Sequence, residues 1–436
     1  MEEEFFHYLW KYRLLDKELR TVAGDPLTIL HPGTHNHDSG PDFFNSRIRF
    51  GDTTWAGNVE IHVNSSDWYK HNHQQDRAYD NVILHVVYEN DIPVTGFNGN
   101  LLPTLSLKGK FPESILSRYK DFLRNQRWIP CEQLIPGVDG FQFSQWSPVL
   151  VLEFQAEKMN RFRDSLDQCL NDWDECFYQQ LSRSFGFRIN AHPFELLSKS
   201  LPVRLLKKYT SQRFQLEALL FGQSGLLFEK FSEDYPQQLQ KEYEFLRQKH
   251  SLEPINPAVW KFLRLRPSNF PTIRIAELAA LLYRRDDLFS IILECKDAES
   301  IRHLFNVRAS DYWSTHFRFS KVSPERHKVL GTSSIDLLIM NFVIPFLFFY
   351  GESKRIESQK EKSLLFLEQM PGEMNTDISR WKELGLPVSN ALQTQALIRL
   401  KRGYCEQKKC LECRIGTKLI SLGVSLKNQE ELMLEP

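Results

Sequence analysis

The chain lacks an excess of charge of either sign. Its 436 residues contain 55 Lys and Arg residues and 55 Asp and Glu residues, so its formal net charge is zero. A protein without net charge creates no overall field that attracts nucleic acid or an anionic membrane surface. Any binding of such polyanions would therefore depend on a local cluster of basic residues.

The sequence has little that would direct it to a membrane. Its longest apolar stretch, residues 337–350, contains Asn341 and Pro345, and it is shorter than the ~20 residues that a membrane span needs. The N-terminus reads MEEEFFHYLWKYRLL, which is acidic where a secretory leader is positively charged. We therefore expect a cytoplasmic protein that does not bind membranes, with residues 337–350 forming a buried helix.

Cysteine is scarce, with seven residues in the chain, and three of them lie close together as Cys405-x4-Cys410-x2-Cys413. This is not the pattern of a secreted disulfide framework. Three clustered thiols can bind zinc or an iron–sulfur cluster, and Cys131 is the expected fourth ligand. The alternative is three reduced thiols at the end of a helix.

The spacing of apolar residues in the sequence changes near residue 112. Seven of the 13 histidines lie between residues 31 and 85, in a region where apolar residues often alternate with polar ones. From Glu113 onward the apolar residues recur with helical spacing, and no segment reads clearly as a strand. We expect an α+β protein with an α/β domain over 1–112 and a larger all-α domain over 113–436, which carries the cysteine cluster.

The residue pattern of the first domain predicts a helix, a strand, a hairpin, a second helix and a buried strand, in that order. Gly51-Asp52 suits a two-residue hairpin turn, and Ser65-Ser66-Asp67 can begin the second helix. The apolar run VILHVVY is typical of a strand that is buried on both faces. The expected elements are a helix at 2–15, strands at 26–30, 43–50 and 53–63, a helix at 67–79, and strands at 82–88 and 101–107.

Polar residues of the hairpin occur in a distinctive order. GPD at 40–42 opens its first strand, and GNVEIH at 57–62 lies on its second. This order resembles the PD-(D/E)xK nuclease superfamily, in which two carboxylates hold Mg²⁺ and a lysine positions the attacking water. The resemblance implies a restriction-endonuclease-like fold, Mg or Mn as cofactor and nucleic acid as substrate. It also implies roles for three residues: Asp42 and Glu60 as metal ligands, and His62 as base or water-positioning group. His35, His37 and Asp38, which precede the hairpin, are further candidate ligands.

Two features depart from that superfamily. His62 stands where the lysine is expected, and an imidazole is neutral for part of the time at pH 7. In addition, a strict two-residue turn would pair Asp42 with Ile61 and send Glu60 to the other face of the sheet. One β-bulge in either strand would reunite the carboxylates, and Gly57 is a suitable place for it.

A second interpretation of this region is a histidine cage. The pairs His35-x-His37 and His71-x-His73, completed by Asp38, Asp42 or Asp76, could bind a transition metal. On a continuous helix over 67–79, however, His71 and His73 would point in different directions. His85 lies within an apolar run, and we expect it to be a core residue.

The best local basic patch contains Arg264, Arg266 and Arg274, around a helix that begins after Pro271. Phosphate groups of a nucleic acid could bind there. The patch could extend to Lys207, Lys208, Arg213, Arg284 and Arg285. The alternative is an ordinary solvated helix face.

Over its full length the sequence resembles a family of uncharacterised bacterial proteins, known only as a domain of unknown function. The matching segments include GNVEIHVNSSDW, NVILHVVYEND, RPSNFPTIRIA and YCEQKKCLECRIG. This resemblance implies no activity. We therefore expect a metal-dependent phosphodiesterase or nuclease-like protein, or else a non-catalytic scaffold with a degenerate nuclease fold that binds nucleic acid or a protein partner. No feature favours the third option, a small-molecule metallohydrolase.

Overall fold

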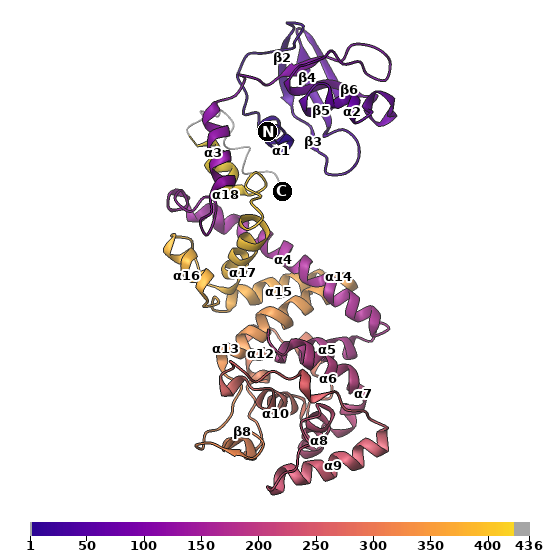
Figure 1. Ribbon diagram of the computed structural model, residues 1–436, viewed down its shortest axis with the longest axis vertical. Coiled ribbons are helices and arrows are strands. Elements are labelled where there is room, and N and C mark those ends of the chain that lie inside the picture. The colour runs from indigo at the N-terminus through magenta and orange to yellow at the C-terminus, as the bar shows by residue number, and fades with distance from the viewer. Residues whose placement is uncertain (1, 423–436) are drawn as a thin grey trace. The chain divides into compact units, whose positions relative to one another are not determined.

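The computed structural model describes residues 2–422 of the chain. Contacts between residues divide it into two compact units. Of the described residues, unit 1 comprises 2–139 and 400–422, and unit 2 comprises 140–399. Unit 1 therefore contains segments from both ends of the chain, drawn in indigo to magenta and in yellow (Figure 1). The division expected at 112 and 113 falls inside unit 1, just before the helix Glu113–Arg124.

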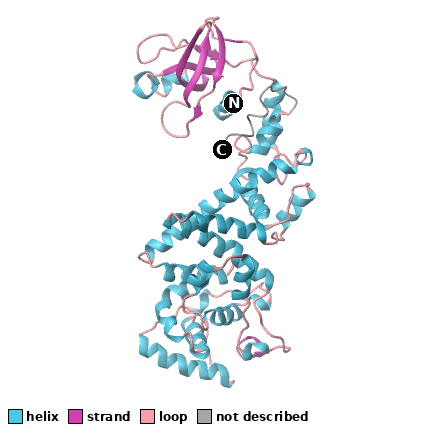
Figure 2. Cartoon of the chain, turned by 180° about the vertical axis from the view of Figure 1, so that it is seen from behind, coloured by secondary structure: helices cyan, strands magenta, loops and turns pink. Residues whose placement is uncertain are grey.

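Unit 1 is built on a mixed seven-stranded sheet with the order β1-β2-β4-β5-β6-β7, and β3 also pairs with β4 (Figure 2). The pairs from β1 to β5 are antiparallel, whereas β6 and β7 run parallel to β5. The elements of this unit are α1 (Glu3–Lys11), β1 (Leu19–Arg20), β2 (Pro26–His31), β3 (Thr34–His35), β4 (Phe43–Phe50), β5 (Thr53–Asn64), α2 (Asp67–Lys70), η1 (His73–Gln75), η2 (Arg77–Tyr79), β6 (Val82–Glu89), β7 (Thr104–Ser106), α3 (Glu113–Arg124), η3 (Ile135–Gly137), η9 (Lys401–Cys405) and α18 (Arg414–Ser421).

The core of this sheet follows from the apolar pattern of the sequence. Helix α1 buries Phe5, Phe6, Leu9 and Trp10 completely, and it contacts β5. The first six residues of β6 are buried, which confirms a strand that is covered on both faces. The expected order of helix, strand, hairpin, helix and buried strand is thus present.

The second helix is much shorter than expected. Instead of one helix over 67–79, α2 ends at Lys70 and two 3-10 turns follow. The interruption lies at Asn72, which has a left-handed backbone with φ of 62°. Asparagine adopts this conformation more readily than most residues. The break redirects the chain between His71 and His73.

The C-terminal segment packs into unit 1. The hydroxyl of Tyr8 in α1 donates to the carbonyl oxygen of Thr417 at 2.9 Å. Arg118 in α3 donates to the carbonyl oxygens of Leu419, Ile420 and Leu422. These bonds place α18 against the N-terminal helix and α3.

Unit 2 is helical, apart from one short ribbon of two strands, β8 and β9, which differs from the all-α expectation (Figure 2). Its elements are α4 (Gly140–Gln168), α5 (Trp173–Phe185), α6 (Ala191–Ser200), α7 (Val203–Leu206), η4 (Lys207–Tyr209), α8 (Arg213–Gln223), α9 (Asp234–His250), η5 (Pro257–Val259), η6 (Pro267–Asn269), α10 (Pro271–Leu282), α11 (Leu288–Glu294), α12 (Ala298–Phe305), η7 (Asp311–Ser314), β8 (His316–Arg318), β9 (Lys321–Val322), α13 (Thr332–Leu338), η8 (Ile339–Val343), α14 (Ile344–Lys354), α15 (Glu357–Gln369), α16 (Thr376–Glu383) and α17 (Ala391–Leu400).

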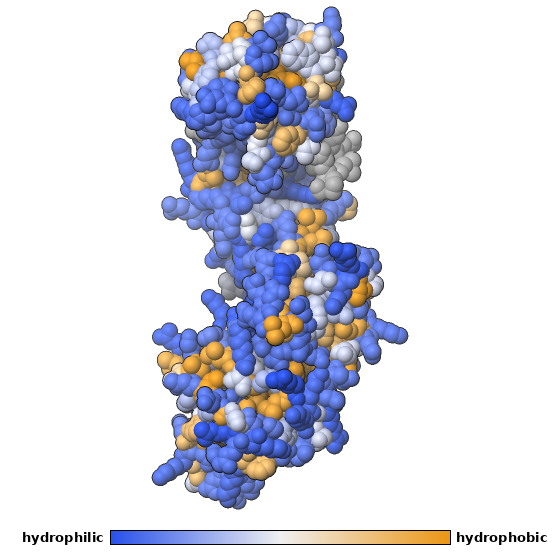
Figure 3. Space-filling view, turned by 90° about the vertical axis from the view of Figure 1, so that its right-hand side faces the viewer, coloured by the Kyte–Doolittle hydropathy of each residue, from blue (hydrophilic) through white to orange (hydrophobic). Residues whose placement is uncertain are grey.

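The most apolar helical segment lies in the core of unit 2. The continuous helix Thr332–Lys354 is long and apolar enough to cross a membrane, but 72% of its most apolar window is buried within the protein. Its Phe342 and Phe346 contact the rings of Phe162 and Phe177. On the face shown in Figure 3, hydrophobic residues occur in separate small groups among hydrophilic ones.

Candidate metal centre

A β-bulge in the β4–β5 hairpin decides which side chains share a face of the sheet. From the turn as far as the pair Ser46–Gly57, the residues pair as a two-residue turn at Gly51-Asp52 requires. Beyond that pair the register shifts, and Phe43 pairs with Val59 instead of Glu60. Strand β4 therefore contains one extra residue. This shift places Asp42, which just precedes β4, opposite Glu60 instead of Ile61.

The bulge lies at Asn45 in β4, not at Gly57. Asn45 has a left-handed backbone with φ of 57°, and its N–H donates to Oδ1 of Asn58 at 3.3 Å. Gly57 serves a different purpose, since a Cβ there would lie only 2.4 Å from Cγ2 of Ile83. The glycine thus allows the close approach of β5 to β6.

The carboxyl groups of Asp42 and Glu60 meet at the end of the hairpin. The N–H of Asp42 donates to Oε2 of Glu60 at 3.1 Å, and the N–H of Ile61 donates to Oδ2 of Asp42 at 2.8 Å. Glu60 is only 4% exposed. Its burial, together with the charge of Asp42, raises the pKa of Glu60 to about 9. A nearby cation would stabilise the ionised form of Glu60 and so lower this pKa.

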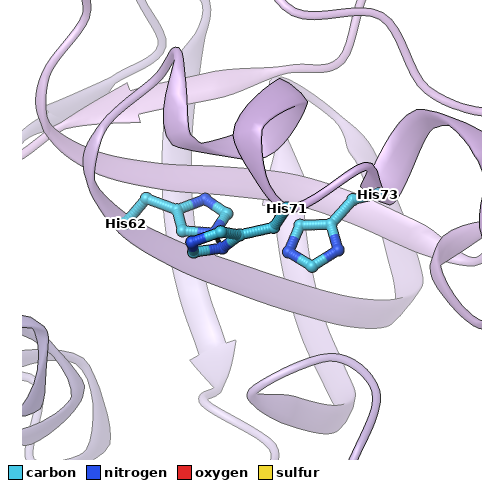
Figure 4. Close-up of side chains that lie close together, drawn as sticks. All are labelled: His62, His71 and His73. Carbon is cyan, nitrogen blue, oxygen red and sulfur yellow. Dashed lines mark hydrogen bonds between the residues drawn. The ribbon is translucent and has the colours of Figure 1, made fainter.

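Three histidines lie around Glu60, and their rings gather at one place (Figure 4). Oε1 of Glu60 lies 3.2 Å from Nε2 of His73 and 3.5 Å from Nε2 of His62. Nε2 of His62 in turn lies 3.2 Å from Nδ1 of His71. Ligands bonded to one tetrahedral zinc-like ion at about 2.0–2.2 Å lie roughly 3.3–3.5 Å from each other. With donor atoms of all three histidines within 4.8 Å of one another, these separations fit three imidazole ligands of one metal ion with Glu60 beside them.

Aromatic and histidine neighbours hold these imidazoles in place. Tyr79 stacks on His73 with ring centroids 3.8 Å apart, and Trp68 lies against both His73 and His85 at 5.3 Å. Nε2 of His85 lies 2.8 Å from Nδ1 of His62. This contact engages one nitrogen of His62 and leaves Nε2 directed toward Glu60, as in metal sites whose ligands are oriented by a second hydrogen bond.

The environment keeps the two buried imidazoles, those of His62 and His73, neutral. Burial, followed by the proximity of other histidines, lowers the pKa of His62 to about 2 and that of His73 to about 4. A neutral imidazole has a lone pair to offer a metal ion. Within residues 2–422, Nε2 of His73 and Nε2 of His7 are buried without a hydrogen-bond partner, although each faces a carboxylate. An ion between nitrogen and carboxylate would satisfy both groups.

A second possible group of ligands adjoins the first. Glu3, His7 and Asp42 each offer an atom within 4.8 Å of the others, and Nε2 of His7 lies 3.3 Å from Oδ2 of Asp42. Burial and the charge of Asp42 raise the pKa of Glu3 to about 7. Sequence analysis missed Glu3 and His7, although their spacing of four residues on a predicted helix places them on one face.

The expected ligands before the hairpin occupy different positions. His35 stacks on Phe43, and its ring lies 4.3 Å from that of His37. Asp38 is exposed. Within the described chain, neither candidate ligand group includes these three residues. His85, expected to be only a core residue, is fully buried but also contacts His62.

The basic residues of unit 2 separate into buried and exposed ones. Binding of nucleic acid would require Arg274 to face solvent. Instead, Arg274 is only 4% exposed and forms an ion pair with Glu277 at 2.7 Å. Arg264 and Arg266 are exposed. Other arginines line a cavity of about 370 Å³, namely Arg213, Arg284, Arg285 and Arg308.

The four candidate cysteine ligands all belong to unit 1. Cys131, Cys410 and Cys413 are buried, and Cys405 is partly buried. All four thiols are free of disulfide bonds. The structure thus brings Cys131 into the same unit as the C-terminal cysteines.

Comparison with known proteins gives one match. No curated protein and no solved structure matches the chain significantly. Residues 3–376 match the family described as a protein of unknown function, DUF2851. This match includes every residue of the two histidine–carboxylate groups, namely Glu60 with His62, His71 and His73, and Glu3 with His7 and Asp42. It also spans both units for most of their length. The chain therefore belongs to the DUF2851 family of proteins of unknown function.

Proposed function

We propose that this protein is a divalent-metal-dependent phosphodiesterase that acts on nucleic acid. One observation carries the proposal: the bulge at Asn45 sets Asp42 opposite Glu60, beside the imidazole of His62. Two carboxylates and an imidazole at one point of a sheet form a donor set for a divalent ion. Phosphodiester hydrolysis is a reaction that such an ion promotes.

The donor set favours Mn²⁺ over Mg²⁺ as the ion. Mg²⁺ prefers oxygen ligands and retains several waters, whereas Glu60 here is accompanied by imidazoles from His62, His71 and His73. Imidazole suits transition metals better than magnesium. When bound, the ion would lower the pKa of a water molecule and neutralise charge on the phosphate.

The protein residues have separable tasks in this proposal. Glu60, His62 and His73 are buried and would hold the ion in a fixed position. His71 is exposed, so water and substrate would approach from its side. Asp42 lies between Glu60 and His7, and it would bind the ion or orient the attacking water.

The likeness to PD-(D/E)xK nucleases supports this reaction class. Asp42 directly precedes β4, Glu60 lies on β5, and a short helix and then β6 follow. The histidine at position 62, where the superfamily has a lysine, also has a role in this proposal. An imidazole binds the ion directly, whereas a lysine would only position water. The restriction-endonuclease-like fold remains part of the proposal.

Nucleic acid is the proposed substrate class because of the arginine-lined cavity in unit 2. Two of the arginines that line this cavity form ion pairs: Arg213 with Glu217, and Arg308 with Asp311. The cavity is lined by four arginines, and Arg284 lies over the ring of Tyr283 at 5.0 Å. Clustered arginines attract phosphates through local charge even when the whole protein is neutral.

Hydrolysis assays test the proposal. Labelled DNA and RNA are incubated with the protein and either Mn²⁺ or Mg²⁺, and products are compared for wild type, Asp42→Asn and Glu60→Gln. We expect metal-dependent cleavage by wild type, with Mn²⁺ the better ion, and loss of cleavage in both variants. Asp38→Asn is the matched control and should retain activity. Cleavage without metal, or unchanged cleavage in both variants, would contradict the proposal.

A non-catalytic binding protein is the second candidate. Backbone N–H groups of Asp42 and Ile61 already bond to one oxygen of each carboxylate, so the hairpin end is partly satisfied without an ion. In that case the protein would bind nucleic acid with equal affinity in the presence of metal and of chelator, and it would cleave none.

A further inference from the structure

Four cysteines gather in unit 1, away from the histidine–carboxylate groups in sequence. Cys405 ends η9, Cys410 follows it, and Cys413 directly precedes α18. Cys131 comes from the segment after α3 and joins them despite its distance along the chain. Three of the four are at most 8% exposed.

The thiols interact with one another. The neighbours that act on Cys405 include the other three cysteines, and those that act on Cys131 include Cys413 and Cys410. These effects, with the contacts of Lys401 to Trp128 and of Lys408 to Leu123 between the same two segments, place the four thiols near one another in unit 1. Free thiols are reactive toward oxidants and metals. Four of them from two distant segments of the chain therefore indicate that a ligand binds them.

The turn that carries Cys410 and Cys413 is tightly constrained around the sulfur of Cys413. The N–H of Gly416 donates to Sγ of Cys413 at 3.4 Å. A Cβ at Gly416 would lie only 2.3 Å from the carbonyl oxygen of Cys410, so only glycine fits this tight turn. Lys408, just before it, has φ of 55°. This backbone N–H favours the thiolate of Cys413, whereas burial raises the pKa of the same thiol in the absence of a metal ion.

We propose that Cys131, Cys405, Cys410 and Cys413 are the four ligands of a thiolate metal centre. Four thiolates bind either zinc or an iron–sulfur cluster. Within residues 2–422, no three of these sulfur atoms lie within 4.8 Å of one another, whereas a single zinc ion holds its sulfurs about 3.8 Å apart. A cluster binds its cysteines through several iron atoms and so spaces them more widely. The spacing favours an iron–sulfur cluster.

The centre would fasten the C-terminal segment to the rest of unit 1. Around it, Lys401 lies over the ring of Trp128 at 5.5 Å, and Lys408 donates to the carbonyl oxygen of Leu123. These contacts join the same two segments as the cysteines. Loss of the centre would therefore loosen the C-terminal segment, while the ligands around Glu60 belong to the sheet and would remain in place.

Metal analysis of the full chain, purified without oxygen, tests the inference. Iron, acid-labile sulfide and zinc are measured per chain for wild type, Cys131→Ser and Cys410→Ser, with Cys295→Ser in unit 2 as the control. We expect iron and sulfide in wild type and in the control, and loss of both in the two ligand variants. Zinc lost in the same variants would support a thiolate centre but overturn the iron assignment. Wild type without either metal, or metal retained in both variants, would overturn the proposal.

Alkylation of the wild type covers the case in which the variants fail to fold. The native protein is treated with iodoacetamide before and after metal is removed with a chelator, and modified cysteines are identified by mass spectrometry. We expect the four ligand cysteines to react only after metal removal, while the reactivity of Cys169, Cys176 and Cys295 stays constant. Equal reactivity of all seven under both conditions would overturn the inference.

Discussion

The backbone N–H of Asp42 donates to Oε2 of Glu60 at 3.1 Å, so two acidic residues lie together at the end of a hairpin whose turn alone would separate them. The extra residue in β4 causes this meeting. A bulge beside a group of polar side chains commonly serves to direct one of them. Here it directs Asp42 toward Glu60 and His7.

The bulge can be tested at Asn45. Asn45→Val should lower the free energy of unfolding by about 1–3 kcal/mol, because a β-branched residue resists a left-handed backbone. It should also weaken metal binding, since the register then tends toward the pairing of Asp42 with Ile61. Asn45→Gly is the control and should preserve both properties. Denaturant unfolding and metal titration measure them, and equal metal affinity in the two variants would argue against the role of the bulge.

Glu60→Gln should separate metal binding from folding. Burial and Asp42 raise the pKa of Glu60 to about 9, so the metal-free protein at pH 7 already holds this carboxyl protonated. A glutamine amide has nearly the same shape and charge, and we expect the unfolding midpoint without metal to change little. Metal affinity should fall steeply, as measured by isothermal titration calorimetry. A variant that binds metal as wild type does would show that Glu60 is not a ligand.

His85 should act through His62 rather than on the ion directly. Its Nε2 lies 2.8 Å from Nδ1 of His62, the position of a group that orients a metal-bound imidazole. Removing such a group lowers metal affinity by about 10–100-fold, and we expect this loss for His85→Phe. His31→Phe, at an exposed histidine of β2, is the control. An unchanged affinity in His85→Phe would leave His85 with a packing role only.

Arg274 should matter for stability and not for nucleic acid. Arg274→Leu would leave Glu277 buried without its 2.7 Å partner, and losing one member of a buried ion pair costs about 3–5 kcal/mol. The exposed Arg266→Ala should leave the unfolding free energy unchanged. Chemical denaturation distinguishes the two variants. Similar stability in both would show that the ion pair is dispensable.

The arginine-lined cavity should bind phosphate groups. Arg284→Glu and Arg308→Glu should each weaken DNA binding and reduce its dependence on salt, because each lost phosphate contact lowers the salt slope by about one. Fluorescence anisotropy at several salt concentrations measures both quantities. Arg163→Glu, on α4, provides a control of equal charge change. If all three variants weaken binding equally, only total charge matters and the cavity is not a site.

The sequence predicted the elements of unit 1 well because their signals are local. Apolar alternation marks the hairpin, and a continuous apolar run marks β6. The break at Asn72 was not predicted, because asparagine is also acceptable within a helix. The consequence was large: a continuous helix would separate His71 from His73, whereas the break brings both to His62.

Longer-range relationships were only partly predictable. The need for a bulge followed from counting residues, but its position at Asn45 is seen only in the strand pairing and in the left-handed backbone of that residue. The return of residues 400–422 to unit 1 has no local signal, since it rests on contacts such as Tyr8 with Thr417. The role of His85 was missed because its neighbours in sequence are apolar, and only the fold shows that it faces His62.

The most direct measurement of the central claim is anomalous X-ray diffraction from crystals of the protein soaked in Mn²⁺. The account predicts an anomalous peak among Glu60, His62, His71 and His73, at about 2.0–2.3 Å from their donor atoms, and no such peak in Glu60→Gln crystals. Manganese found only at exposed carboxylates elsewhere, with the imidazoles of wild type still in contact with each other, would contradict it.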